Sequence, residues 1–296
     1  MAKDDTGSLV LRAGELSLEL CPAAGGTIAG MWHGDTPLMR KPDRALLRAG
    51  NPRGAASWPL VPWSNRVRGA RFDWRGRSIS LASDALGGET AIHGNGWRRR
   101  WEVRDERPSA AMLMHAHDPD GFWPFAYEAR QGFALSATGL VLWMAVTNTG
   151  DGDMPAGLGH HPYFRRTPDA RLRVGLGEMW EGDEQKFPLR RVPVPERFDF
   201  SAGRDVDPVD LDAVFVGWTR PARIEWPADG LALDISASEV FGRLVVFIPP
   251  GQPFFAVEPV SHDTDAFNAP GAASGLRVLA PGQTLQGEMR FAVSRR

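Results

Sequence analysis

The stretch "QTLQGEMRFAV", residues 283–293, alternates apolar and polar side chains with a period of two. The residues on its apolar face are Leu285, Gly287, Met289, Phe291 and Val293. Successive side chains of an extended strand point to opposite faces of a sheet, so this alternation predicts an antiparallel strand with one buried face.

Period-two alternation recurs along the chain and predicts further strands. The segments are 16–20, 101–106, 141–148, 223–226, 231–238 and 243–248. The 33 glycines and 24 prolines are spread along the sequence, and no window of about 12 residues keeps a helical apolar stripe without one of them. We therefore expect an all-β fold, a large antiparallel β-sandwich with few short helices. No repeat or linker divides the chain, which predicts a single domain over residues 1–296.

The charge balance favours a small molecule as the ligand. With 34 Lys and Arg against 36 Asp and Glu, the formal net charge is -2, which gives no reason to expect nucleic acid or an anionic membrane as a partner. No apolar run approaches the ~20 residues of a membrane span, and the acidic start "MAKDDTGSLVL" does not fit a signal peptide. Cys21 is the only cysteine, so an intrachain disulfide is excluded and a cytoplasmic location is expected.

Two adjacent histidines occur in "GLGHHPYFRR", residues 157–166. Pro162 restricts His161 to extended geometry, and neighbouring side chains then point to opposite faces, so only one of His160 and His161 can face a given pocket. The best partner for such a histidine is Glu258, which ends the apolar run "FFAV" and can have a shifted pKa there. The alternative is that Glu258 is a strand-end glutamate paired with an arginine.

A second histidine, His93, lies in "AIHGNGWRRRW", where two glycines separate it from Trp97. An imidazole beside tryptophan suits a sugar pocket, although Trp97 and Trp101 can equally be core anchors, with Arg98 to Arg100 a solvated run. "GNGW" lacks the third glycine of a dinucleotide-binding fingerprint, and no "GxSxG" motif is present.

The segment "HAHD" places His115 and His117 on one face of a strand, a spacing that can bind a metal as in cupins. No glutamate follows to complete the ligand set, so cross-strand polar packing is the favoured interpretation and no metal site is predicted.

Five segments appear together in an order typical of one enzyme family. They are "PWSNRVRGARFDWRG", "AIHGNGWRRRW", "GLGHHPYF", "LDAVF" and "FFAVEP". With these landmarks, which span residues 60–260, the sequence resembles the aldose 1-epimerase (galactose mutarotase) family. The resemblance implies a large β-sandwich enzyme that interconverts the α- and β-anomers of an aldohexose without a metal or an organic cofactor, as a monomer or homodimer.

The resemblance also implies roles for individual residues. His161 is similar to the catalytic acid and Glu258 to the general base. The implied sugar-binding residues are Arg66, His93, Asp212, Asn65 and Trp97, with Asp210 as the alternative to Asp212. His160 is then the non-catalytic member of its pair.

Two arginine segments depart from the family's usual pattern. Arg165 and Arg166 follow "PYF", where many relatives carry an asparagine and an apolar residue, and "WRRRW" is unusually basic. If these arginines reach the pocket, an anionic sugar such as a hexose 6-phosphate or a sulfonated sugar becomes the substrate. The residues are also compatible with a non-catalytic carbohydrate-binding or sensing module and with a metal-dependent cupin-like enzyme. The joint presence of His161 and Glu258 favours the epimerase over both.

Overall fold

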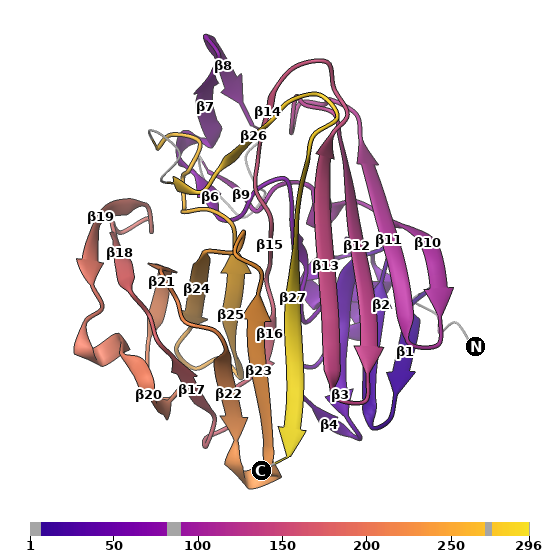
Figure 1. The fold of residues 1–296 in the computed structure, drawn as a ribbon, viewed down its shortest axis with the longest axis vertical. Coiled ribbons are helices and arrows are strands. Elements are labelled where there is room, and N and C mark those ends of the chain that lie inside the picture. Colours follow the sequence, from indigo (N-terminus) through magenta and orange to yellow (C-terminus); the bar gives the residue numbers. More distant parts are fainter. Residues whose placement is uncertain (1–6, 82–89, 270–273, 296) are drawn as a thin grey trace.

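A computed structural model describes residues 7–81, 90–269 and 274–295; the first six residues of the acidic N-terminal stretch lie outside this part. The fold is all-β, and the paired strands of every sheet run antiparallel (Figure 1). Strands cover all six segments for which alternation predicts them.

The larger of the two main sheets has nine strands and is built around the segment 283–293. Its strands, in spatial order, are β10 (Glu102–Arg107), β11 (Ala110–His117), β12 (Tyr127–Ser136), β13 (Gly139–Asn148), β27 (Thr284–Arg295), β23 (Leu231–Ala237), β22 (Ala222–Trp226), β17 (Arg171–Val174) and β20 (Phe200–Asp205). Strand β27, yellow in Figure 1, lies between β13 and β23 in the middle of this sheet, so the most regular alternation belongs to a central strand.

The second main sheet has eight strands and lies on the left of Figure 1. Seven of them follow in spatial order: β19 (Pro188–Pro193), β18 (Glu178–Gly182), β21 (Leu211–Val216), β24 (Arg243–Ile248), β25 (Phe254–Val260), β15 (Gly159–His160) and β5 (Pro59–Leu60). The eighth strand, β16 (Tyr163–Arg165), also pairs with β25.

Smaller elements complete the fold. A four-stranded sheet, of which β1 and β2 pack against β12, contains β1 (Leu9–Ala13), β2 (Leu16–Cys21), β3 (Thr27–His33) and β4 (Thr36–Pro37). The two-stranded sheets pair β6 (Arg66–Val67) with β9 (Ala91–Ile92), β7 (Arg71–Trp74) with β8 (Arg77–Ser80), and β14 (Met154–Ala156) with β26 (Arg277–Leu279). The helices are α1 (Arg44–Arg48) and the 3-10 turns η1 (Pro52–Gly54), η2 (Arg68–Ala70), η3 (Gly96–Arg98), η4 (Glu196–Phe198) and η5 (Pro227–Asp229), as short as the glycine and proline content predicts.

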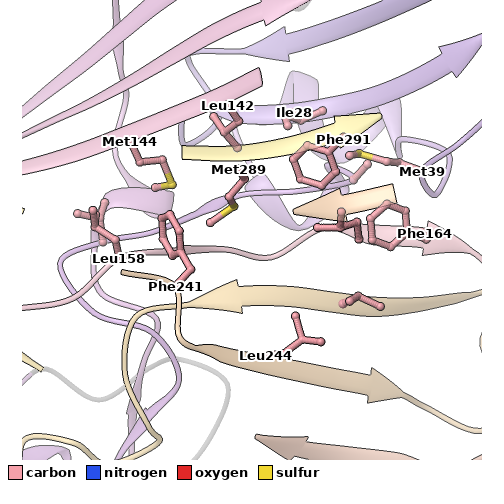
Figure 2. Close-up of a cluster of buried hydrophobic side chains, with 14 of the residues drawn as sticks. Ile28, Met39, Leu142, Met144, Leu158, Phe164, Phe241, Leu244, Met289 and Phe291 are labelled. Carbon is pink, nitrogen blue, oxygen red and sulfur yellow. The ribbon is translucent and has the colours of Figure 1, made fainter. Parts of the chain in front are cut away.

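The main core contains side chains from both large sheets. Figure 2 shows Leu142 and Met144 of β13, Met289 and Phe291 of β27, and Leu244 of β24 in one cluster of buried side chains. All five are at most 1% exposed, and burying a side chain of this size stabilises a fold by about 1.5–3 kcal/mol. The face of β27 that alternation assigns to the core is therefore the face that is buried.

Strand β25 is buried on both faces, and this arrangement positions the candidate site. Phe255 and Val257 belong to the main core, whereas Ala256 and Val260 belong to a second apolar cluster with Trp58. Even-numbered residues of β25 therefore face away from the main core, and Glu258 is one of them.

Candidate functional site

Three neighbouring strands bring the predicted acidic residues to one face of the eight-stranded sheet. Glu258 of β25 lies opposite Val245 of β24, and Asp212 of β21 lies opposite Phe247 of β24. Val245 and Phe247 both belong to the second apolar cluster, so Asp212 and Glu258 share its face. The register of the sheet places the two carboxylates together although 46 positions separate them, counted from 212 to 258.

The adjacent histidines point to opposite sides, as the extended geometry predicts. His160 is fully buried, with Nδ1 hydrogen-bonded to the Ser57 hydroxyl and Nε2 3.2 Å from Oε1 of Gln131 on β12. Burial lowers the pKa of His160 to about 3, so its ring is neutral. His160 thus connects the two large sheets, while His161 lies on the face that carries Glu258.

His161 and Glu258 form a buried acid–base pair. Nε2 of His161 lies 3.3 Å from Oε1 of Glu258, and their side chains are 8% and 3% exposed. The Tyr163 hydroxyl lies 3.3 Å from the same nitrogen, and the rings of Tyr163 and Trp58 pack on the imidazole with centroids 4.4 and 4.8 Å away. Nδ1 of His161 is buried and makes no hydrogen bond within the described part of the chain, so Nε2 is the ring nitrogen that faces Glu258 and Tyr163.

Burial shifts the pKa values of this pair in opposite directions. The pKa of Glu258 is raised well above its ordinary value, chiefly by desolvation and then by the carboxylate of Asp212. The charge of Arg66 acts in the opposite direction and lowers this pKa. The pKa of His161 is lowered well below its ordinary value, chiefly by desolvation and then by His93 and Arg40. Each shift disfavours the charged form of its group and so favours the one-proton state of the pair, with a neutral carboxyl and a neutral imidazole.

The segment that carries Arg66 is held by side chains at three successive backbone N–H groups. The N–H of Ser64 donates to Nε2 of His262 at 3.0 Å. The N–H of Asn65 donates to Nδ1 of His93 at 3.0 Å, and that of Arg66 donates to Oδ1 of Asn65 at 2.9 Å. Asn65 and His93 both have positive φ, 64° and 65°. Non-glycine residues in this conformation are strained and often belong to functional sites.

These bonds fix the chemical form of His93. Its pKa is lowered to about 3 by burial and by the charges of Arg66 and Arg98, so the ring is neutral. Because Nδ1 accepts the Asn65 N–H, the proton of the neutral ring is on Nε2, which is a hydrogen-bond donor. The His93 ring lies 5.3 Å from that of His161, centroid to centroid, so this donor belongs to the same site.

Arg66 and Asp212 lie beside each other at the rim of the site. Nη2 of Arg66 is 3.7 Å from Oδ2 of Asp212, and Nη1 is 3.2 Å from Oδ1 of Asn65. Asp210 is exposed and precedes β21, so Asp212 is the aspartate that the fold places beside Arg66. Arg66 and Asp212 line a pocket together with Trp180 and Lys186.

The remaining predicted positions are more peripheral to the acid–base pair. Trp97 stacks on Trp58 with centroids 5.5 Å apart and is only 3% exposed, which leaves little ring surface for a sugar, and its role in binding stays a prediction. Arg99 pairs with Asp120 and is exposed, as a solvated run predicts. Arg98 instead lies half-buried over the Trp97 ring, at 4.6 Å, since the turn η3 directs it inward.

The unusual arginines after "PYF" are engaged in ion pairs away from His161. Arg165 lies 2.6 Å from Asp229, and Arg166 lies 2.6 Å from Asp207. Arg166 also donates to the carbonyl of Pro249. Their partners thus lie in η5 and in the loops that follow β20 and β24.

Four residues that lie at the site are not among those predicted from the sequence: Trp58, Tyr163, Trp180 and Arg40. Alternation could have identified Tyr163, because it is two residues from His161 on the same extended segment. Trp58, Trp180 and Arg40 come from distant segments whose proximity depends on the sheet order.

The "HAHD" histidines lie in the interior of the fold. His117 bonds to Asn95 and to the carbonyl of Trp123, and burial lowers the pKa of His115 to about 4. Within residues 7–81, 90–269 and 274–295 there is no group of three or more His, Cys, Asp or Glu residues that could hold a metal ion. His117 thus has the polar packing expected of the pair, whereas Nε2 of His115 is buried without a hydrogen-bond partner in the described residues and its ring packs near Trp101 and Tyr127.

Comparison with known proteins agrees with the fold and the landmark segments. The sequence profile of the family described as aldose 1-epimerase matches residues 8–292. A relative from Escherichia coli K12, the uncharacterized protein YphB, is 31% identical over 96% of this chain and 97% of its own length. The chain belongs to the aldose 1-epimerase family.

Solved structures show the same fold. A crystal structure from Escherichia coli K12, described as a candidate aldose 1-epimerase, superposes with a TM-score of 0.89 at 30% identity over 98% of this chain and 99% of its own. Galactose 1-epimerase from Lactobacillus acidophilus NCFM superposes with a TM-score of 0.79 at 16% identity, over 97% of this chain and 94% of its own. In the described part of the chain, no helix is long and apolar enough to cross a membrane.

Proposed function

We propose that the protein is an aldose 1-epimerase acting on a neutral aldohexose, with Glu258 as general base and His161 as general acid. The observation that carries the proposal is the buried pair itself, with Nε2 of His161 3.3 Å from Oε1 of Glu258. Interconversion of anomers requires removal of a proton from the C1 hydroxyl and delivery of a proton to the ring oxygen. A carboxylate and an imidazole on one side of the sugar supply both groups.

The proton count of the pair suits this reaction. One proton shared by Glu258 and His161 can lie on the carboxyl or on the imidazole without any exchange with solvent. When this proton lies on His161, Glu258 is the base and His161 the acid for ring opening. Ring opening moves the proton of the pair to Glu258, and the reverse transfers at ring closure return it to His161. Each such proton transfer typically contributes about 10²- to 10⁴-fold in rate.

The neighbouring polar groups serve orientation in this proposal. Arg66 and Asp212 bind sugar hydroxyls by charge-assisted hydrogen bonds. The Nε2–H of His93 donates to a sugar oxygen near His161. The C1–O5 bond breaks as the C1 hydroxyl loses its proton and the ring oxygen gains one; after rotation about C1–C2 the bond re-forms with the reverse proton transfers and gives the other anomer.

The test is the rate at which α-glucose and α-galactose relax to anomeric equilibrium, followed by polarimetry with the spontaneous rate subtracted. Wild type should accelerate the relaxation, whereas His161→Ala and Glu258→Gln should lose at least about 100-fold in kcat. Sugar affinity measured by NMR titration should stay within about tenfold.

One control variant and one wild-type outcome complete the test. Asp210→Asn removes an exposed acid close to Asp212 in sequence and should leave turnover unchanged. Sugar binding by wild type without any acceleration of either sugar would refute the enzyme and support a carbohydrate-binding role.

A further inference from the structure

Arg40 is an unusual cation beside the acid–base pair. Its Nε donates to the carbonyl of Ala55 at 2.8 Å and its Nη2 donates to the carbonyl of Arg53 at 2.7 Å. Its Cζ lies 4.1 Å from the centroid of the Tyr163 ring and 5.2 Å from that of Phe254. The centroid of the Trp58 ring lies 5.6 Å from the same atom, so two carbonyls and three aromatic rings hold the guanidinium in one orientation.

This guanidinium has no acidic partner. Among residues 7–81, 90–269 and 274–295, no carboxylate forms an ion pair with Arg40, and its Nη1 makes no hydrogen bond. Burial lowers the pKa of Arg40, and Tyr163 acts in the opposite direction. Half-buried arginines are ordinarily paired, because an unpaired charge away from water is costly.

A groove lies in front of Arg40. Its apolar lining comes from Pro37, Met39, Leu46 and Phe254. The charged residues that line it are four cations, Arg40, Lys41, Arg53 and Arg165, and one acid, Asp43. The Asp43 carboxylate accepts the backbone N–H groups of Ala45 and Leu46, so it is directed to the start of α1. Because Arg165 is paired with Asp229, the charge excess of the groove comes from Arg40, Lys41 and Arg53 against Asp43, and it lies beside an apolar lining.

We propose that this Arg40 groove is a binding site for a small organic oxyanion, a carboxylate, phosphate or sulfonate, with Arg40 as its principal anion ligand. Such an oxyanion matches the donor geometry of a guanidinium, and the apolar lining accepts the carbon part of the ligand. The site borders the acid–base pair, because the Tyr163 ring that packs on Arg40 carries the hydroxyl 3.3 Å from His161. The oxyanion is either a substituent of the sugar itself or a separate molecule.

The first experiment is a titration with inorganic phosphate, followed by calorimetry or by protein NMR at constant ionic strength. Wild type should bind phosphate, and Arg40→Gln should weaken that binding at least about tenfold. The matched control is Arg290→Gln, which removes an exposed arginine paired with Glu288 on β27 and should leave phosphate binding unchanged. If Arg40→Gln does not fold, Lys41→Gln replaces an exposed side chain of the groove and should weaken binding about two- to fivefold.

The second experiment identifies the source of the oxyanion and rests on the proposed function. The anomerisation kcat/KM is compared for glucose and glucose 6-phosphate, in wild type and in Arg40→Gln. A preference for the phosphorylated sugar that Arg40→Gln removes supports an anionic substrate. Phosphate binding without such a preference supports a separate ligand.

Binding and turnover fail separately in this design. Phosphate binding that is undetectable, or equal in wild type and Arg40→Gln, overturns the anion site whether or not the protein is an epimerase. Loss of all turnover with intact, Arg40-dependent phosphate binding overturns the proposed function alone and supports the anion site.

Discussion

Asn65 should act by positioning Arg66 as well as by contacting sugar. Its side-chain oxygen accepts two hydrogen bonds from Arg66, one from the backbone N–H at 2.9 Å and one from Nη1 at 3.2 Å. Asn65→Gly removes both bonds, keeps the backbone N–H that reaches His93, and tolerates the positive φ of 64°. This substitution therefore isolates the side-chain contribution.

The expected magnitude comes from the exposure of the pair. A hydrogen bond to a charged group contributes about 1.5–3 kcal/mol, but the Arg66 side chain is 28% exposed, so about 1 kcal/mol is appropriate. We expect Asn65→Gly to lower kcat/KM about fivefold, mainly through KM, and to lower the unfolding free energy by about 1–2 kcal/mol. Asn65→Ala should cost about 1 kcal/mol more in stability, because a Cβ in the left-handed region is strained.

The assay combines polarimetric kinetics on α-glucose with urea unfolding. Asn65→Asp is the matched control, because its carboxylate keeps an acceptor for Arg66 and tolerates the same backbone conformation, so its kcat/KM should stay within about threefold. The ¹⁵N shifts of His93 should report the Nε2–H form in every variant, since the backbone donor is retained. A kcat/KM of Asn65→Gly within twofold of wild type would refute the claim that Asn65 holds Arg66.

Three further predictions test the pair, the second histidine and the core. The pH profile of kcat/KM should be flat near neutrality, and its acid limb should lie below pH 6.5, the ordinary pKa of histidine. The reason is that a second proton enters the pair only at the lowered pKa of His161. An acid limb above pH 6.5 would contradict the single-proton pair. His160→Ala leaves Oε1 of Gln131 without its buried partner and should lower the unfolding free energy, measured with urea, by about 2–4 kcal/mol. The kcat per folded molecule should stay within about threefold of wild type. A loss of kcat of about 100-fold would make His160 catalytic. Gly287→Ala places a Cβ 2.4 Å from Val240 and should lower the unfolding free energy by about 1–3 kcal/mol. Ala292→Ser, on the exposed face of β27, should change it by less than about 0.5 kcal/mol. Equal effects of the two substitutions would refute the packing argument.

The sequence predicts the strands well because alternation is a local property. Residues 283–293 specify which of their side chains face the core, and the structure agrees, whereas 243–248 specify a strand but no single buried face, because both faces are apolar. The strand at 102–107 shows the limit, since all six of its residues are exposed at the edge of a sheet and its alternation reports no buried face. Alternation also cannot give sheet order, which depends on pairing between strands far apart in sequence.

The candidate site is predictable from the sequence where one segment has both a fixed extended geometry and functional residues at a spacing of two. His161 and Tyr163 share a face because they are two residues apart, and Pro162 fixes the extended geometry between them. Arg40 illustrates the opposite case, because nothing in "PLMRK" indicates that its guanidinium packs on Tyr163. Long side chains from loops reach partners that only the folded chain brings near, so their roles follow from the structure alone.

The position of Glu258 explains why a strand, and not a loop, carries the proposed base. Its neighbours Val257 and Phe255 are fully buried in the main core, so the backbone of β25 is fixed by packing on the opposite face. A carboxylate on such a strand cannot move toward water to recover its hydration, and its pKa stays raised. A loop would allow Glu258 to separate from His161, ionise in solvent and lose the shared proton. The apolar packing of one face of β25 is thus the physical cause of the acid–base properties on the other.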